Sequence, residues 1–540
     1  MNAQYKLPTI QNEPIFGYAP GSAERLALEA ELARQRATTI EAPMYIGGQW
    51  VTTGEKVAMT PPHDHQHLLG HYHRGNASHV RAAIDAALAA KPAWEAMPWQ
   101  DRAAIFLRAA DLLSGPWRYR LNAATMLCQS KTCHQSEIDA VCELADFWRY
   151  GVHFQEFIYQ QQPGCQPGVW NRLEYLPLEG FVFAITPFNF TAIAGNLPSA
   201  PALMGNTVVW KPSDDQIYSA WYVMRILEEA GLPKGVINLV YADGQEAGDV
   251  IFNHPDFAGL HFTGSTGVFR NLWKTIGQNL DRYRTYPRIV GETGGKDFVL
   301  VHPSANREEV TAGLIRGAFE FNGQKCSAAS RAYLPASRAD ELLQHLKSEL
   351  ETIRQGGPEA FHNFVTAVIS RRAYDKITGY IRRAQEDPQV TLFHGGKYDD
   401  SKGYFIEPTV LITKNPHSLT MEEEIFGPVL TVYVYPDAEW EQTLELVNRT
   451  SPYALTGAVF SRDREALAQA AHHLRHAAGN LYLNDKPTGA VVNQQPFGGG
   501  RASGTNDKAG SYLNLLRWVS PRAIKDVLVS PADYRYPFLG

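Results

Sequence analysis

The chain has 540 residues, of which 44% are hydrophobic and 20% are charged. This length exceeds what one hydrophobic core usually holds, so we expect at least two domains. The 50 basic and 56 acidic residues leave a net charge of −6 without a long run of one sign. That balance disfavours a nucleic-acid or membrane surface and favours a small-molecule substrate.

The five cysteines are too few and too irregularly spaced for a disulfide framework, which indicates a reducing compartment. The first residues, MNAQYKLPTIQNEP, have neither the apolar core of a signal peptide nor an Arg-rich amphipathic pattern. No apolar run reaches the length of a membrane span. We therefore expect a cytoplasmic protein, or a mitochondrial matrix protein without its presequence if the source is eukaryotic.

The first part of the chain predicts few regular elements. Residues 1–40 form a polar lead-in, and short β-like pieces such as 44–50 follow. Further on, five histidines lie close together, at His63, His65, His67, His71 and His73. A metal site is one interpretation, but a strand would turn Asp64, the nearest acid, to the face opposite the first three. We favour a solvent-facing hairpin without a metal.

From about residue 76 the pattern becomes helical. Asn76 or Ser78 can cap a helix whose apolar residues recur at every fourth position, at Val80, Ile84 and Leu88. Residues 101–115 and 135–160 repeat this spacing. We expect helices in all three segments, each with one buried face.

Short apolar strands then alternate with helices, at 181–185, 207–211, 236–240 and 260–263. Apolar runs of this length suit strands covered on both faces, which predicts a parallel, doubly wound sheet of the kind that binds nucleotides. Helices at about 217–230 and 267–280 supply the crossovers. The alternation resumes after about residue 290, at 297–301, 332–334 and 457–460, and predicts a second α/β domain.

Cys326 is the candidate nucleophile, near the start of that second domain. It follows Lys325 directly, with Gly323 two residues earlier, and precedes a run of small residues. A nearby positive charge lowers the pKa of a thiol and so activates it. The other four cysteines have no comparable setting, and we interpret them as packing residues.

Two further segments carry candidate polar groups. Glu292 stands in GETGGK at 291–296, where the glycines permit tight turns and close approach to a ligand. Asn189 follows a predicted strand, so its amide can point into the cleft at the strand's carboxyl end. Taken singly, the acid suits an ordinary loop and the amide an ordinary turn.

Together these segments resemble the aldehyde dehydrogenase superfamily. Seven motifs appear in the family's order: TPFNF (186–190), WKPS (210–213), FTGST (262–266), GETGGK (291–296), GQKC (323–326), EEIFGPV (423–429) and PFGG (496–499). Longer segments, among them NFTAIAGNLPSAPALMGN and RASGTNDK, are similar to the subfamily that oxidises L-glutamate γ-semialdehyde to L-glutamate, the second step of proline catabolism. That similarity runs nearly from end to end.

The resemblance implies a fold and a division of the chain. The fold is α/β, with a Rossmann-type NAD-binding domain at 1–165 and 187–290 and an α/β catalytic domain at 291–499. An oligomerisation arm, expected as a β-hairpin, and a C-terminal tail take 166–186 and 500–540. Superfamily members exchange such arms between subunits, so we expect a homo-oligomer, a dimer or larger.

The resemblance also implies a covalent mechanism. Cys326 attacks the aldehyde, while Asn189 and the backbone N–H of Cys326 stabilise the oxyanion. Loss of hydride to NAD leaves a thioester, and Glu292 activates the water that hydrolyses it, for which its pKa should be drawn toward neutrality.

The cofactor implied is NAD, because an acid at Asp214 disfavours a 2′-phosphate. The residues implied to bind it are Thr186, Lys211, Ser213, Asp214, Gly264, Ser265, Thr266 and Glu424. Many superfamily members have glycine where Phe269 stands, so we expect looser or differently shaped pyrophosphate contacts here.

The substrate implied is a small amino-acid aldehyde. Its carboxylate is anchored by Ser327 and the loop Gly489 to Ala490, whose backbone N–H groups suit an anion. Phe190 and Phe497 flank its chain. No metal is implied.

Three alternatives stay open at this stage. A dehydrogenase of another small aldehyde would share the mechanism, although the 488–490 loop and RASGTNDK argue against it. A thiol hydrolase would pair Cys326 with one of the 18 histidines, yet no motif singles one out. An inactive binding protein would more naturally have lost Cys326, Glu292 or Asn189.

Overall fold

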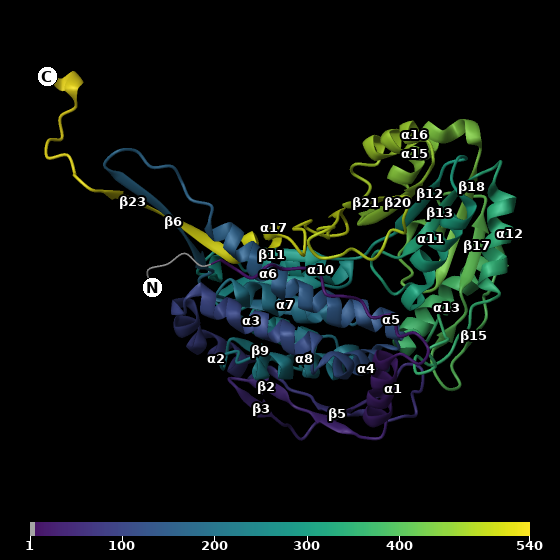
Figure 1. Cartoon of the computed structure of the whole chain (residues 1–540), viewed down its shortest axis with the longest axis horizontal. Coiled ribbons are helices and arrows are strands. Elements are labelled where there is room, and N and C mark those ends of the chain that lie inside the picture. Colours follow the sequence, from purple (N-terminus) through teal and green to yellow (C-terminus); the bar gives the residue numbers. More distant parts are fainter. Residues whose placement is uncertain (1–5) are drawn as a thin grey trace.

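The computed structural model describes residues 6–540. Two seven-stranded sheets, each covered by helices, form the two expected α/β domains, and a two-stranded arm projects from the first domain on the side away from the second (Figure 1). The predicted fold class is therefore confirmed.

The first sheet has the strand order β11-β10-β7-β8-β9-β2-β3. Its five parallel strands are β7 (Phe181–Thr186), β8 (Thr207–Pro212), β9 (Ile237–Leu239), β10 (Phe257–Thr263) and β11 (Arg288–Glu292). The antiparallel hairpin of β2 (Met44–Ile46) and β3 (Gln49–Val51) extends one edge. The predicted parallel strands and the short β pieces near residue 44 are thus present.

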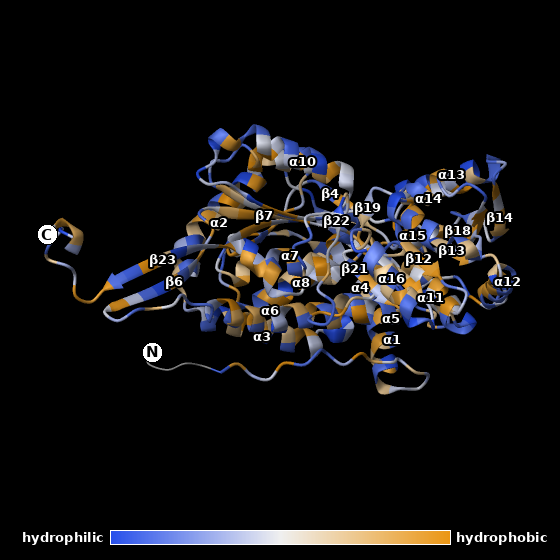
Figure 2. Ribbon diagram, turned by 90° about the horizontal axis from the view of Figure 1, so that it is seen from above, coloured by the Kyte–Doolittle hydropathy of each residue, from blue (hydrophilic) through white to orange (hydrophobic). Residues whose placement is uncertain are grey.

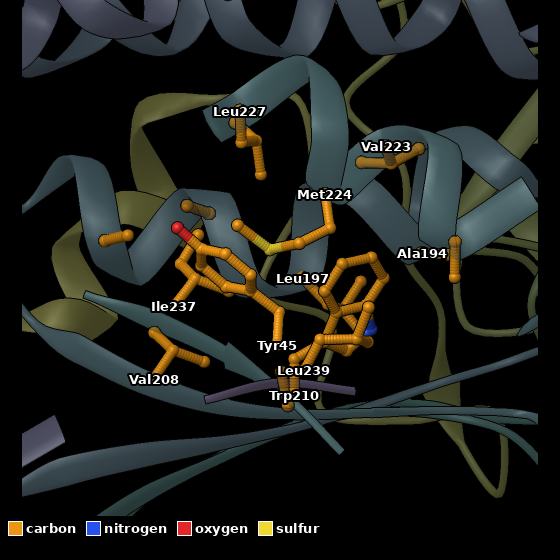
Figure 3. Packing of buried hydrophobic residues seen from close by; sticks show 14 of the residues in the cluster. Tyr45, Ala194, Leu197, Val208, Trp210, Val223, Met224, Leu227, Ile237 and Leu239 are labelled. Atoms are coloured by element: carbon orange, nitrogen blue, oxygen red, sulfur yellow. The ribbon is translucent and has the colours of Figure 1, made fainter. Parts of the chain in front are cut away.

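Helices cover both faces of this sheet. They are α2 (Ala77–Ala96), α3 (Trp99–Ser114), α4 (Arg118–Gln129), α6 (Glu143–Tyr159), α7 (Thr191–Leu203), α8 (Ile217–Glu229), α9 (Gly244–Ile251) and α10 (Thr266–Gln278). Asn76 caps α2 as predicted, by accepting a hydrogen bond from the backbone of Ser78. Figure 3 shows the core beneath α7 and α8, where Trp210 and Leu239 of the sheet pack beside Leu197 and Met224.

The second sheet has the order β14-β17-β18-β13-β12-β20-β21. Its strands are β12 (Asp297–Val301), β13 (Ala329–Pro335), β14 (Val390–His394), β17 (Thr409–Thr413), β18 (Val429–Tyr435), β20 (Thr456–Phe460) and β21 (Asn480–Leu483). Only the edge strand β14 runs antiparallel to its neighbour. The helices that cover it include α11 (Arg307–Phe319), α12 (Ala339–Leu350), α13 (Arg371–Glu386), α15 (Trp440–Arg449) and α16 (Arg464–His473).

The polar lead-in contains a helix that the sequence analysis missed. Helix α1 (Ala23–Arg36) begins after Ser22, whose side chain accepts a hydrogen bond from the backbone of Arg25. Leu28 and Leu32, one turn apart, are its buried apolar residues, so the apolar face is too narrow to stand out in a polar sequence. The first five residues of the lead-in lie outside the described range.

The histidine cluster does lie on a hairpin, formed by β4 (Lys56–Met59) and β5 (Gly70–His73) with the connecting turn. The prediction that it faces solvent is wrong for His63, which is buried and hydrogen-bonds to Ser130 and Glu359. His65 contacts the carbonyl of Asp400 instead. The prediction is wrong for His73 as well, which is buried and lies 2.9 Å from Glu41. The cluster is thus divided between contacts with the second domain, at His63 and His65, and contacts within the first, at His73.

The arm differs from the predicted hairpin. Strand β6 (Val169–Pro177) pairs along its length with β23 (Val519–Val527), from the far end of the sequence (Figure 2). The range 166–186 also includes β7, which lies inside the first sheet rather than in the arm. Likewise Trp518 is fully buried against His261 in the first core, so much of 500–518 belongs to the body.

None of the helices in residues 6–540 is both long and apolar enough to cross a membrane.

Candidate active site

Cys326 lies between the short helix Glu320–Gly323 and β13. The backbone there is left-handed at three successive residues, with φ of 49° at Phe321, 54° at Asn322 and 67° at Gly323. A Cβ on Gly323 would lie 2.2 Å from the carbonyl oxygen of Gly427, so only glycine fits. Asn322 accepts a hydrogen bond from the backbone of Thr366 and thereby holds this costly conformation.

The thiol is partly exposed and stands between two cavities. One cavity is lined by all five predicted substrate residues: Phe190, Ser327, Gly489, Ala490 and Phe497. The other is lined by Glu424 and by Gly295, at the turn after Glu292. One sulfur atom can thus meet one ligand from each side.

The loop at 488–490 is built to receive an anion. Gly489 has φ +91°, and the hydrogen bonds of residues 6–540 include none donated by the N–H of Gly489 or Ala490. Ser327 donates its hydroxyl proton to Thr488 at 2.9 Å, which joins the loop to the residue after the nucleophile. Two free backbone donors beside a hydroxyl suit a carboxylate.

Asn189, Glu292 and Cys326 come together as predicted. The Asn189 amide is buried and donates one N–H to the carbonyl of Gln324, two residues before the nucleophile, at 3.1 Å; its second N–H has no partner among residues 6–540. Glu292 ends β11, and its charge acts directly on the Cys326 thiol. Burial raises the pKa of Glu292 from 4.5 to about 8, as its expected role as a base requires.

The prediction that Lys325 lowers the pKa of the Cys326 thiol is wrong. Desolvation raises that pKa well above 9.0, and the negative charge of Glu292 raises it further. Lys325 does not offset this effect because its ammonium is buried between Asp139 (3.5 Å) and Glu320 (3.6 Å). The free protein therefore favours the thiol over the thiolate.

One carboxylate in the cavity lined by Phe190 and Phe497 was not predicted from the sequence. Asp139 and Glu143 both line that cavity, but Asp139 is paired with Lys131 at 2.9 Å. Glu143 forms no ion pair among residues 6–540, and burial beside Asp139 raises its pKa well above 4.5. The only sequence signal was a pair of acids four residues apart in a predicted helix, which is the spacing of one helical face.

The predicted adenosine residues lie at the carboxyl ends of β7 and β8. Lys211 is the next-to-last residue of β8. Its ammonium lies 3.6 Å from the carboxylate of Asp214, a side chain that is half exposed. Ser213 donates its backbone N–H to the carbonyl of Thr186 and so ties the two strand ends together. This is the edge at which parallel sheets bind nucleotides.

Gly264, Ser265 and Thr266 form the turn that begins α10. Ser265 caps the helix, and Thr266 accepts a hydrogen bond from the N–H of Gly294. A helix N-terminus supplies N–H groups and a positive dipole end, which suit a pyrophosphate. Phe269 points inward, stacks on Phe262 with ring centres 5.4 Å apart and fills the space over Gly291. Its effect on pyrophosphate contacts stays a prediction.

Glu424 lies across the cleft from this turn. Its carboxylate accepts a hydrogen bond from the N–H of Gly295 at 2.9 Å and lines the cavity on the second side of Cys326. Burial raises its pKa. The predicted cofactor residues therefore follow one path, from the end of β8 past α10 to the thiol.

The pKa of Cys326 leads to a test. We expect iodoacetamide to alkylate Cys326 in the free protein slowly at pH 7.5 and progressively faster above pH 9, because the thiolate is the reactive form. Exposed Cys165 in the same sample serves as the reference and should react first. Peptide mass spectrometry gives both rates. Faster labelling of Cys326 at pH 7.5 would contradict the raised pKa.

Comparison with known proteins agrees with this geometry. A model of the aldehyde dehydrogenase family matches residues 50–520. The Δ1-pyrroline-5-carboxylate dehydrogenase of Agaricus bisporus is 53% identical over 539 residues, which are 99% of this chain and 98% of that one. The mitochondrial enzyme of that name from Dictyostelium discoideum is 49% identical over 540 residues, with 99% and 97% covered.

A solved structure is similar along the whole chain. The Δ-pyrroline-5-carboxylate dehydrogenase of Mycobacterium tuberculosis bound with NAD has a TM-score of 0.97 and 52% identity, and 100% of both chains is covered. The family match covers most of the sequence, and these relatives are similar over nearly all of it. The chain belongs to the aldehyde dehydrogenase family.

Proposed function

We propose that this protein oxidises L-glutamate γ-semialdehyde, the open form of Δ1-pyrroline-5-carboxylate, to L-glutamate with NAD, a step of proline catabolism. The observation that carries the proposal is the cavity at Cys326, where an anion-binding loop and an unpaired carboxylate face the same space. An α-amino acid end group requires both. The two relatives described above are named as dehydrogenases of Δ1-pyrroline-5-carboxylate, the cyclic form of this substrate.

The reaction begins at the sulfur. Cys326 loses its thiol proton to solvent as its sulfur adds to the aldehyde carbon and the C=O π electrons move to oxygen. The second N–H of Asn189 and the backbone N–H of Cys326 stabilise the resulting oxyanion. NAD, when bound, accepts the hydride, and Lys211, the start of α10 and Glu424 are placed to hold it. The acyl group of the substrate is then bound to Cys326 as a thioester. Glu292 takes a proton from the water that hydrolyses this thioester.

The amino-acid end of the substrate lies away from the thiol in this proposal. The free N–H groups at 489 and 490 hold the carboxylate, and the Ser327 hydroxyl donates to it when its proton turns from Thr488 to the ligand. Glu143 faces the ammonium, and a bound cation lowers the pKa of a neighbouring carboxyl, so it favours the ionised form of Glu143. Phe190 and Phe497 enclose the aliphatic chain.

A thiol hydrolase is disfavoured. Among the described residues no histidine lines either cavity at Cys326. The acid that acts on the thiol, Glu292, has a pKa suited to activating water at a later step. A dehydrogenase for simple aldehydes would leave the free donors at 489 and 490 without a partner.

Two further parts of the proposal concern assembly and location. The arm of β6 and β23 extends from the body, and Trp170 in it is 56% exposed, which suits association with a second copy (Figure 2). We propose a homo-oligomer, a dimer or larger, on this ground. Cytoplasm stays the expected location, with the mitochondrial matrix for a eukaryotic source, as in the name of the Dictyostelium relative.

Substrate preference tests the proposal. NADH formation is measured with L-glutamate γ-semialdehyde, succinate semialdehyde and propanal, and we expect the first to have the highest kcat/KM because only it fills both polar sites. Cys326→Ala should abolish turnover of all three. Equal kcat/KM values for the three aldehydes would refute the assignment.

Glu292→Gln isolates the hydrolysis step. We expect a rapid burst of NADH and a steady rate lower by about 10²–10⁴-fold, the usual loss for a missing general base. In the wild type, the carboxyl is protonated below its raised pKa and acts as a base above it, so kcat should rise with pH around a midpoint near 8. Stopped-flow absorbance separates burst from steady state. A variant without a burst would place Glu292 before hydride loss instead.

Glu143→Gln tests the ammonium contact. The amide keeps the shape but not the charge, so KM for the amino-acid aldehyde should rise about tenfold, the value of one charge-assisted hydrogen bond. KM for propanal should not change. The same variant made at the exposed Glu386, at the end of α13 in the second domain, is the matched control. An equal rise for both aldehydes would show a general distortion of the cavity.

A further inference from the structure

The anchor loop, residues 488–497, is held firmly at its two ends. Thr488 accepts the hydroxyl proton of Ser327 at one end. At the other end Phe497 and Ala509 exchange backbone hydrogen bonds of 2.9 and 2.8 Å. Between them, the loop carries the free N–H groups at 489 and 490. Asn493 donates its backbone N–H to the carbonyl of Gly510 at 3.4 Å, and a further contact holds Val492 and Gln494 on either side of it.

That contact comes from the opposite end of the sequence. Asn12 donates one amide N–H to the carbonyl of Val492 at 3.0 Å, and its own amide oxygen accepts from Gln494 at 3.0 Å. The second N–H goes to the carboxylate of Asp146 at 2.8 Å, and the backbone N–H of Glu13 goes to the same carboxylate at 2.8 Å. One side chain thus joins the loop to helix α6.

Helix α6 is the element that carries Glu143, one turn before Asp146. Asn12 therefore connects the loop with the carboxylate donors to the helix with the ammonium acceptor. An α-amino acid presents its two charges at a fixed separation, so the two protein elements must also keep a fixed separation. The side chain of Asn12 spans them directly.

The segment around Asn12 is itself anchored. Glu13 pairs with the buried Arg118 at 2.6 Å, and the Arg118 guanidinium lies 3.7 Å over the ring of Phe16. Tyr18 donates its hydroxyl proton to the buried Glu137 at 2.7 Å. In Figure 2 this part of the chain runs extended along the first domain to α1. Asn12 is consequently presented by a fixed strap and not by a loose end.

We propose that Asn12 is a positioning residue that confers specificity for the amino-acid end of the substrate, by locking the anchor loop to helix α6. The inference rests on the proposed function, in which that loop and Glu143 hold the two charges. Asn12 does not line the cavity at the thiol, so it acts through the loop and through helix α6, which it joins. Oxidation of an aldehyde that has no amino-acid end does not depend on Asn12.

Asn12→Ala tests the inference in the full chain. With both loop contacts and the Asp146 contact removed, we expect KM for L-glutamate γ-semialdehyde to rise about tenfold or more, as for the loss of a net hydrogen bond or two. The kcat for that substrate and the kcat/KM for propanal should stay within about twofold of wild type. Asn253→Ala, at an exposed asparagine of the first domain, is the matched control.

Two outcomes overturn the inference. If both aldehydes lose efficiency equally, Asn12 is a structural residue only, and if neither changes, the loop is fixed without it. The wild-type preference is measured first, so the two proposals can be told apart. A wild type that prefers the amino-acid aldehyde, with an Asn12→Ala variant that keeps this preference, refutes Asn12 alone, whereas a wild type without preference refutes both.

A second variant covers poor folding of the first. Gln494 is an exposed side chain of the loop, and Gln494→Ala removes only its hydrogen bond to Asn12. The contacts of the strap with α6 stay intact. We expect the same selective rise in KM, smaller than for Asn12→Ala. Melting curves of each variant establish that the protein is folded. A folded Gln494→Ala protein with a loss shared by propanal would also count against the proposal.

Discussion

The left-handed turn before Cys326 is the constraint on which the site depends. Three successive residues with positive φ bring the backbone against the carbonyl of Gly427, where no side chain fits at Gly323. The chain leaves this turn with the sulfur between two cavities and the next residue, Ser327, at the anchor loop. Substrate and cofactor sites therefore share one atom because one turn fixes it.

Burial of charge is the second principle of the site. Glu292 and Glu424 both have raised pKa values because little water reaches them, and the thiol between them is held in its neutral form. The cations nearby, Lys131 and Lys325, both pair with Asp139, and Lys325 pairs with Glu320 as well. Burial thus favours the neutral form of each of these groups in the free protein, which suits a mechanism that creates charge only when a ligand is bound.

Distant segments complete the substrate side. The anchor loop belongs to the end of the second domain, Glu143 to the first, and Asn12 to the strap that precedes α1. In the proposed function, specificity for a doubly charged end group therefore depends on how the two domains and the strap are held together. The buried Arg118 and Glu137 pair secures the strap, and breaking such a pair is costly because it leaves a buried charge without a partner.

The sequence by itself determined the two α/β domains, the parallel strands and the candidate residues, because apolar runs and motifs are local signals. Around the motif residue Cys326, Glu424 lines the same cavity, Glu292 acts on the thiol through its charge, and Asn189 bonds to the backbone two residues before it. Helix α1 was missed because its buried face is narrow. The arm was predicted as a local hairpin, yet β6 pairs with β23, and pairing over such a distance leaves no local signal.

Only the tertiary structure decided the electrostatics and the contacts across the sequence. Lys325 precedes Cys326, which predicted an activated thiol, but its charge is neutralised by Asp139 and Glu320 from other elements. Glu143 and Asn12 carry no motif, and they matter through the groups that folding places beside them. A pKa or a hydrogen bond depends on neighbours in space, and those neighbours are fixed only when the chain has folded.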